Sequence, residues 1–201
     1  MNRYSSRIRV ALASLAIALL LVSCASGPPG RDVNDPTSSL VFGYMDMADA
    51  PTEVDWVSLK QVGTPTDEGY WSLGVDDGLV FNQYLPVGSY QMAQFGGSGF
   101  MAGDVRYSFP AYGKNETAVR ITKPGVYFLG SFKYVKVKTG LFAPGKFDIE
   151  RTSTPTEREL LERIQKLKEM KGTQWVARIA ARLAELPAGA TRTKPSAKVK
   201  G

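Results

Sequence analysis

The sequence has no histidine and a single cysteine, Cys24, among its 201 residues. The lack of histidine excludes Ser-His-Asp and Cys-His nucleophilic systems and every metal site that depends on imidazole. One cysteine cannot form an internal disulfide or a multi-thiolate metal site. Carboxylates, lysines, serines and tyrosines remain for chemistry, and we predict no cofactor, no bound metal and no enzymatic activity.

The chain also lacks an apolar run long enough for a comfortable membrane-spanning helix. Residues 10–22 form an apolar run of 13 residues, whereas a spanning helix needs about 20. Arg3, Arg7 and Arg9 precede this run, no acidic residue does, and small residues stand at its end. This order is typical of a secretory signal peptide.

The run ends in Leu21-Val22-Ser23-Cys24, which resembles the lipobox of bacterial lipoproteins. The resemblance implies that the signal peptide, residues 1–23, is removed and that Cys24 is lipidated with a diacylglyceryl group and usually an acyl chain such as palmitate. Ala25 follows, where lipoproteins of the inner membrane often carry aspartate, so the resemblance implies the outer membrane, facing the periplasm. Two alternatives are a buried core helix and a secretory signal whose cysteine stays unmodified.

The positive charge lies at the two ends of the chain. The net charge is +6 and falls to +3 once the three arginines of residues 1–23 are removed. Residues 187–201 carry Arg192, Lys194, Lys198 and Lys200 and no acid, which leaves residues 24–186 at −1. A region with this slightly negative net charge does not indicate nucleic-acid binding, which needs a basic face on the folded domain. We expect residues 187–201 to be a disordered basic tail, or alternatively to contact anionic envelope polymers.

A linker and a β-rich domain follow the cysteine. Residues 24–37 are rich in proline and glycine and have no aromatic residue, so we expect a flexible linker. Beyond it, β-branched and aromatic segments alternate with turn residues, and Val57 and Leu59 alternate with polar neighbours as in antiparallel sheets with one wet face. We predict an antiparallel β-sandwich over 38–151, with strands near 39–46, 54–62, 69–75, 79–84, 88–95, 104–109, 117–123, 126–137 and 146–150.

One hairpin carries a further resemblance. Asp77-Gly78 is followed seven residues later by Leu85-Pro86-Val87-Gly88-Ser89-Tyr90, which resembles the hairpin of carboxypeptidase-regulatory-like, or prealbumin-like, β-sandwich domains. The resemblance covers about 15 residues and implies that fold for the first half of the domain. It also implies a binding or accessory role and transfers no catalytic residue. We expect Tyr90 to point into the core.

The hydrophobic period changes to a helical one after residue 152. Thr154 is the expected N-cap, with Pro155 at the first helical position and Glu157 completing a capping box. Gly172 is expected to end this helix and Thr173 to cap the next. We predict a helical hairpin over 152–186 that packs on the sheet; the alternative is that its apolar stripes dock on a partner.

Candidate ligand sites are few and unspecific. The segment Phe95, Gly96, Gly97, Ser98, Gly99 and Phe100 is expected to be a mobile loop that contacts a ligand or partner. Trp56, Tyr70, Trp71 and Tyr84 would form a sugar-stacking platform if they shared a face. The acids concentrated in the first third would serve Ca²⁺ binding or glycoside hydrolysis if they converged; they are Asp46, Asp49, Glu53, Asp55, Asp67, Glu68, Asp76 and Asp77. Ser131 and Lys133 are the serine–lysine pair on one strand that we name as a candidate nucleophile and base.

These observations favour a membrane-anchored lipoprotein that serves the bacterial envelope as a non-enzymatic binding or structural module. Its expected partners are the membrane, through lipid on Cys24, and an envelope protein. A module that binds glycans or cell-wall polymers is the first alternative, and a carboxylate-based hydrolase is the second.

Overall fold

The computed structural model describes residues 31–99, 103–109, 117–137 and 146–187. The predicted signal peptide, the predicted lipidation site Cys24, Phe100 and the residues after Pro187 lie outside these residues. The chain divides into two units, Met1–Asp32 and Val33–Gly201. The fold described below is that of the second unit.

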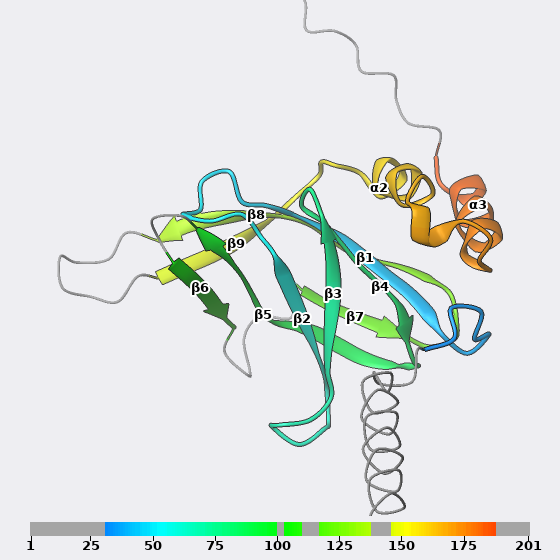
Figure 1. Ribbon diagram of the computed structural model, residues 1–201, viewed down its shortest axis with the longest axis horizontal. Coiled ribbons are helices and arrows are strands. Elements are labelled where there is room, and N and C mark those ends of the chain that lie inside the picture. Colours follow the sequence, from blue (N-terminus) through cyan, green and yellow to red (C-terminus); the bar gives the residue numbers. More distant parts are fainter. Residues whose placement is uncertain (1–30, 100–102, 110–116, 138–145, 188–201) are drawn as a thin grey trace, which may run out of the picture. The chain divides into compact units, whose positions relative to one another are not determined.

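The second unit is mainly β, as the sequence predicts, and each of the nine predicted strands is present (Figure 1). The strands are β1 (Ser39–Asp46), β2 (Trp56–Gln61), β3 (Tyr70–Asp76), β4 (Leu79–Leu85), β5 (Gly88–Gly99), β6 (Gly103–Ser108), β7 (Ala118–Ile121), β8 (Val126–Val137) and β9 (Lys146–Thr152). Two helices follow, α2 (Glu157–Ile164) and α3 (Trp175–Glu185), with a short 3₁₀ helix, η3 (Lys168–Met170), between them.

The strands form one curled, mixed sheet, and the predicted antiparallel sandwich is not confirmed. The order is β6-β5-β2-β3-β4-β1-β8-β9, with β7 also paired to β5. Strand β1 runs antiparallel to β4 but parallel to β8. Both faces of β1 are covered, and Leu40, Val41 and Phe42 are fully buried. A continuous apolar run is typical of such a strand, but side-chain alternation does not reveal whether a neighbour is parallel.

The inner face of the curled sheet encloses the larger hydrophobic core. Val57 and Leu59 of β2 belong to it, as the predicted alternation requires, although Ser58 between them is also buried on the other face. Val119 of β7 belongs to the same core. Where the ends of the sheet approach each other, Tyr107 of β6 stacks on Phe95 of β5 at 4.8 Å between ring centroids, and it contacts Tyr134 of β8 and Phe147 of β9. These aromatic contacts join the two halves of the curl.

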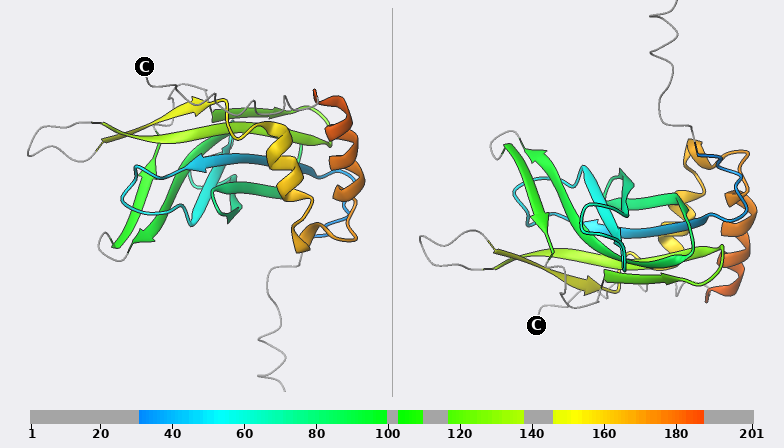
Figure 2. Two further views of the ribbon diagram at one scale, coloured as in Figure 1. Left: turned by 90° about the horizontal axis from the view of Figure 1, so that it is seen from above. Right: turned by 90° about the horizontal axis from the view of Figure 1, so that it is seen from below.

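The two helices cover the outer face of the sheet next to β1 and build a second core. Leu160 and Ile164 of α2 and Trp175 and Ile179 of α3 are fully buried against Phe42 and other residues of β1 and β4. Figure 2 shows both helices at one side of the sheet. The hairpin is therefore part of the folded unit, as the sequence predicts. Among the helices in the described ranges, none has the length and apolar character needed to cross a membrane.

The start of α2 is a correction to the sequence prediction. The N-cap is Thr156, not Thr154, and the capping box is completed by Glu159, whose backbone N–H donates to the Thr156 hydroxyl. The sequence holds two overlapping Thr-x-x-Glu patterns, so spacing alone does not choose between them. The carbonyl of Thr154 instead accepts from Thr152, and that of Pro155 accepts from Ser131. These bonds tie residues 154–155 to the sheet.

The end of α2 is also earlier than predicted. The helix ends at Ile164, not at Gly172, and η3 occupies part of the remaining segment. Gly172 has a φ of +73°, which glycine adopts without steric cost. The N-cap of α3 is Gln174, not Thr173 as predicted, although the Thr173 hydroxyl accepts a hydrogen bond from the backbone N–H of Trp175 at 3.2 Å. The apolar stripe continued past Ile164 because Leu167 and Met170 pack on the same core.

Residues 33–37, which the sequence assigns to the linker, belong to the second unit. The side chain of Gln174 donates to the carbonyls of Val33 and Asp35, at 3.0 and 2.7 Å. Arg178 donates to the carbonyl of Pro36 and lies over the ring of Trp175. These side chains at the start of α3 satisfy backbone carbonyls of residues 33–36, so a proline-containing segment is ordered here despite its composition.

Candidate ligand-binding face

The glycine-rich segment predicted as a mobile loop is instead the last part of strand β5, as far as Gly99. Residues 94–99 pair with β6, and residues 94–96 also pair with β2. Phe95 is fully buried, and Phe100 lies beyond the described residues. The sequence prediction was wrong because it treated these glycines as turn residues.

The glycines of β5 allow close packing rather than loop motion. A Cβ atom at Gly97 would lie 2.0 Å from the carbonyl oxygen of Glu53. A Cβ at Gly96 would lie 2.2 Å from the carbonyl of Val105 and 2.9 Å from the indole of Trp56. No side chain fits at these distances, so the segment before β2 and the Trp56 ring both rest directly on the β5 backbone.

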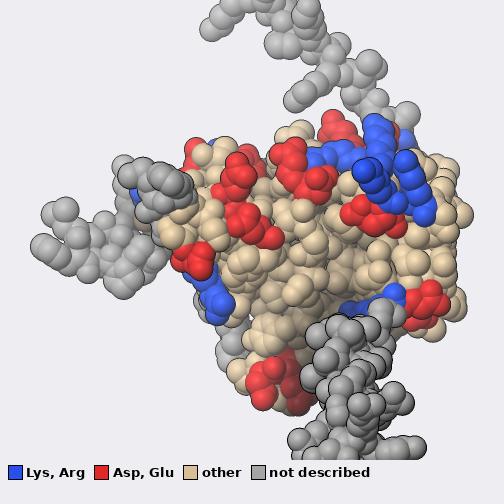
Figure 3. All heavy atoms as spheres, in the orientation of Figure 1, with Lys and Arg blue, Asp and Glu red and all other residues tan. Residues whose placement is uncertain are grey.

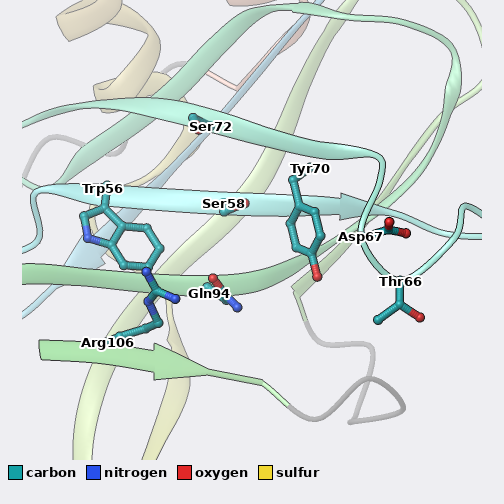
Figure 4. Close-up of a pocket in the computed structure, with 8 residues that line it drawn as sticks. All are labelled: Trp56, Ser58, Thr66, Asp67, Tyr70, Ser72, Gln94 and Arg106. Atoms are coloured by element: carbon teal, nitrogen blue, oxygen red, sulfur yellow. The ribbon is translucent and has the colours of Figure 1, made fainter.

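Two of the four candidate aromatic residues share the outer face of the sheet. Trp56 and Tyr70 line the same shallow hollow, on β2 and β3 (Figure 4). Trp71, next to Tyr70, faces the inner core and meets Tyr90 edge to face at 6.4 Å. Tyr84 lies on β4 and does not line the hollow. The predicted platform is therefore a pair, Trp56 and Tyr70.

The hollow between these rings has a polar floor and a volume of about 480 Å³. Its floor carries Ser58 of β2, Ser72 of β3 and Gln94 of β5, and Figure 4 shows Ser58 and Gln94 between the two rings. The remaining lining residues are Thr66 and Asp67 at the Tyr70 end and Arg106 at the Trp56 end. A larger hollow of about 1150 Å³ adjoins it and shares Thr66, Tyr70 and Gln94. This face thus offers two aromatic side chains with hydroxyl and amide groups between them.

Arg106 is the residue of the hollow that sequence reasoning missed. Its guanidinium carbon lies 5.6 Å from the centroid of the Trp56 ring. In the sheet register Gly96 is the partner of both Trp56 and Arg106, so the three residues form a row across β2, β5 and β6. Fifty residues separate Trp56 from Arg106 in the chain, and only the strand order β6-β5-β2 brings them together.

Tyr70 is held in place by the loop between β2 and β3. The ammonium of Lys60 lies 4.7 Å from the Tyr70 ring centroid and donates to the backbone carbonyls of Pro65 and Glu68. Tyr70 is 46% exposed. An exposed aromatic ring held by a fixed cation is available to a ligand at little entropic cost.

The acidic residues of the first third do not assemble into one site. Asp55 accepts the backbone N–H of Ser98 at 2.7 Å, and Asp49 pairs with Lys133 at 2.7 Å. Asp76 and Asp77 lie beside Arg163 of α2. Across the ranges the structure describes, no three acidic side chains are placed to hold a metal ion. Asp49, Asp55, Asp76 and Asp77 thus each have a local structural contact.

Ser131 and Lys133 do not form the pair that their spacing allows. Ser131 is buried and its hydroxyl donates to the carbonyl of Pro155 at 2.5 Å. The hydrogen bond from Lys133 to Asp49 raises the pKa of the lysine above its ordinary value. A base must be neutral to accept a proton, so this ion pair opposes such a role.

Comparisons of the chain with protein-family models, with curated proteins and with solved structures find no match.

Proposed function

We propose that this protein is a lipoprotein of the bacterial envelope, anchored through Cys24 to the outer membrane and facing the periplasm. Its folded unit acts as a non-enzymatic binding or structural module. The lipid confines the module to a thin layer, which raises its effective concentration for partners in that layer.

One observation carries this proposal. A basic start and a short apolar run end in Leu21-Val22-Ser23-Cys24, and Cys24 is the single cysteine of the chain. Several acyl chains on one cysteine would hold the protein firmly, since each buried methylene contributes about 0.8 kcal/mol. The folded unit begins at Val33, so a short segment would separate it from the lipid.

Replacement of the cysteine tests the proposal. We expect Cys24→Ala to move the protein from the membrane fraction to the soluble fraction, while the control Ser26→Ala leaves it in the membrane fraction. Membrane association of Cys24→Ala equal to that of the unaltered protein would overturn the lipid anchor.

We further propose that the β3–β4 hairpin, together with the turn that leads from β4 into β5, is of the prealbumin-like kind. Strand β4 pairs with β3 and β1, and β5 pairs with β2, so β4 and β5 do not themselves form a hairpin. Its support is local: Asp77 and Gly78 form the β3–β4 turn with φ values of +48° and +73°, and Tyr90 is fully buried. The parallel pairing of β1 with β8 departs from an antiparallel sandwich. The proposal therefore concerns the hairpin and its accessory role, not the whole sheet.

We propose that a second basic region, besides the tail of residues 187–201, contacts anionic envelope polymers. Lys166, Lys168 and Lys171 are exposed in the segment after α2, with Lys168 in η3, and Figure 3 shows Lys and Arg side chains gathered near α2. We propose that these lysines act together with the tail. Deletion of residues 188–201 should then weaken binding to anionic vesicles at low salt, and neutralising the three lysines should weaken it further.

A glycan-binding module is the second candidate function. Trp56 and Tyr70 on one polar face favour it, because sugars stack their apolar faces on aromatic rings and bond their hydroxyls to polar side chains. A glycan array probed with the protein, with Tyr70→Ala as the variant, tests this candidate. Lack of binding to every saccharide would remove it and leave the lipid anchor untouched.

A further inference from the structure

We propose that the hollow between Trp56 and Tyr70 binds an acidic oligosaccharide, with sugar rings on the two aromatic side chains and a sugar carboxylate on Arg106. This inference rests on the glycan-binding candidate above and adds the charge of the ligand and the residue that selects it.

The ring of Trp56 orients the guanidinium of Arg106. Gly96 separates Trp56 from Arg106 in the sheet and carries no side chain, so the indole crosses the β5 backbone and meets the guanidinium. Figure 4 shows the arginine side chain extending from β6 toward the ring. Contact with an aromatic ring fixes the plane of a guanidinium while its N–H groups stay available for hydrogen bonds.

The N–H groups of Arg106 are available to a carboxylate of the ligand. Arg106 is exposed and makes no ion pair with a residue that the structure describes. Asp104, on the same strand, accepts the hydroxyl of Ser98 at 2.8 Å. The planar fork of an arginine matches a carboxylate at two points. A sugar carboxylate therefore matches this fork in shape and in the sign of its charge.

The separation of Trp56 and Tyr70 sets the length of the ligand. Tyr70 lies opposite Lys60 in the β2–β3 register, four residues along β2 from Trp56. Four residues of a strand extend about 13 Å. One sugar ring does not cover this distance, so the two aromatic side chains fit an oligosaccharide. Asp67 and Thr66 stand at the far end, where they can accept sugar hydroxyls.

The test compares an acidic oligosaccharide with its neutral methyl ester, which keeps the same sugar rings. Calorimetric titration of the full-length protein in detergent micelles would use trigalacturonic acid and its fully methyl-esterified, neutral form. We expect the acid to bind about tenfold or more tightly than the ester, because a charge-assisted, two-point hydrogen bond is lost in the ester. This comparison needs no variant and is independent of variant folding.

Variants then assign the effect to Arg106. Arg106→Gln should weaken binding of the acid about tenfold and leave binding of the ester nearly unchanged. Arg106→Lys should restore only part of the affinity, because an ammonium keeps the charge but not the planar fork. Lys136→Gln, at an exposed position on β8 that lines neither hollow, is the control for loss of one positive charge and should bind like the unaltered protein.

The possible outcomes separate this inference from the function on which it rests. Equal affinity for acid and ester, or unchanged binding by Arg106→Gln, overturns the acidic ligand while glycan binding stands. Binding of neither saccharide overturns the acidic ligand, and the glycan array then decides whether glycan binding itself fails.

Discussion

The phenol of Tyr90 donates a hydrogen bond to the backbone carbonyl of Pro86, four residues earlier, at 2.9 Å. The ring itself is fully buried in the inner core. The bond therefore joins the turn between β4 and β5 to the core below it, and it satisfies a hydroxyl that burial removes from water.

Tyr90→Phe is expected to lower the free energy of unfolding by about 1 kcal/mol, because it removes this bond and leaves the Pro86 carbonyl with one partner fewer. Urea denaturation measures the change. Tyr70→Phe is the control, since Tyr70 is exposed and its replacement should alter stability by less than about 0.5 kcal/mol. Equal stability of the two variants would contradict the structural role of Tyr90.

Trp175→Ala should be among the most destabilising single changes, at about 3–5 kcal/mol. The side chain is fully buried between α3 and the sheet, and its removal leaves a large cavity. Val176, the next residue, is 39% exposed, so Val176→Ala should cost less than about 0.5 kcal/mol. A Trp175→Ala variant as stable as Val176→Ala would show that the helices are dispensable for the core.

The elements were predictable because they depend on local patterns. The strands were found through alternation and turn residues, and Asp77-Gly78 marked a turn that the structure contains. The position of the α2 start was missed because Thr154 and Thr156 offer the same capping pattern, and hydrogen bonds to the sheet decide between them. The pairing of β1 with β8 joins strands about 85 residues apart, and no local pattern encodes it.

The glycines of β5 provide a test of close packing. Gly97→Ala should lower the free energy of unfolding by about 1–3 kcal/mol, because the new Cβ collides with the Glu53 carbonyl. Gly74→Ala on β3 is the matched control, since its Cβ would meet its nearest neighbours at an ordinary 3.7 Å. Thermal unfolding compares the two variants. Similar midpoints would contradict the view that Gly97 is a packing residue.

Stability should fall as the pH rises above 10. Burial raises the pKa of Tyr90 above the ordinary value of 10.0. Burial and a hydrogen bond between Tyr107 and Tyr134 raise the pKa of Tyr107 above the same value. Between the ordinary and the folded pKa, the unfolded chain loses protons that the folded protein keeps, so the free energy of unfolding decreases with pH. Below pH 10 the contribution is fully present.

Urea denaturation from pH 9 to pH 11 measures this decrease. The Tyr107→Phe variant should show a shallower decline than the unaltered protein, because one of the perturbed groups is gone. An identical slope for both proteins would contradict a raised pKa for Tyr107.

The candidate face was only half predictable. The sequence indicates Trp56 and Tyr70 as candidates because tryptophan and tyrosine side chains can stack on sugar rings. No feature of the sequence distinguishes Arg106 from the other arginines. Its position beside Trp56 follows from the β6-β5-β2 order and from Gly96 between them. Gly96 was predicted to lie in a loop. That wrong prediction hid the pairing of β5 with β6, and with it the position of Arg106 beside Trp56.

Mass spectrometry of the native protein purified from membranes tests the lipid on Cys24 directly. We predict a chain that begins at Cys24 and carries a diacylglyceryl group and an acyl chain on that residue. A chain that still begins at Met1, or one whose Cys24 bears a free thiol, would contradict the proposal that lipid holds this module at the membrane.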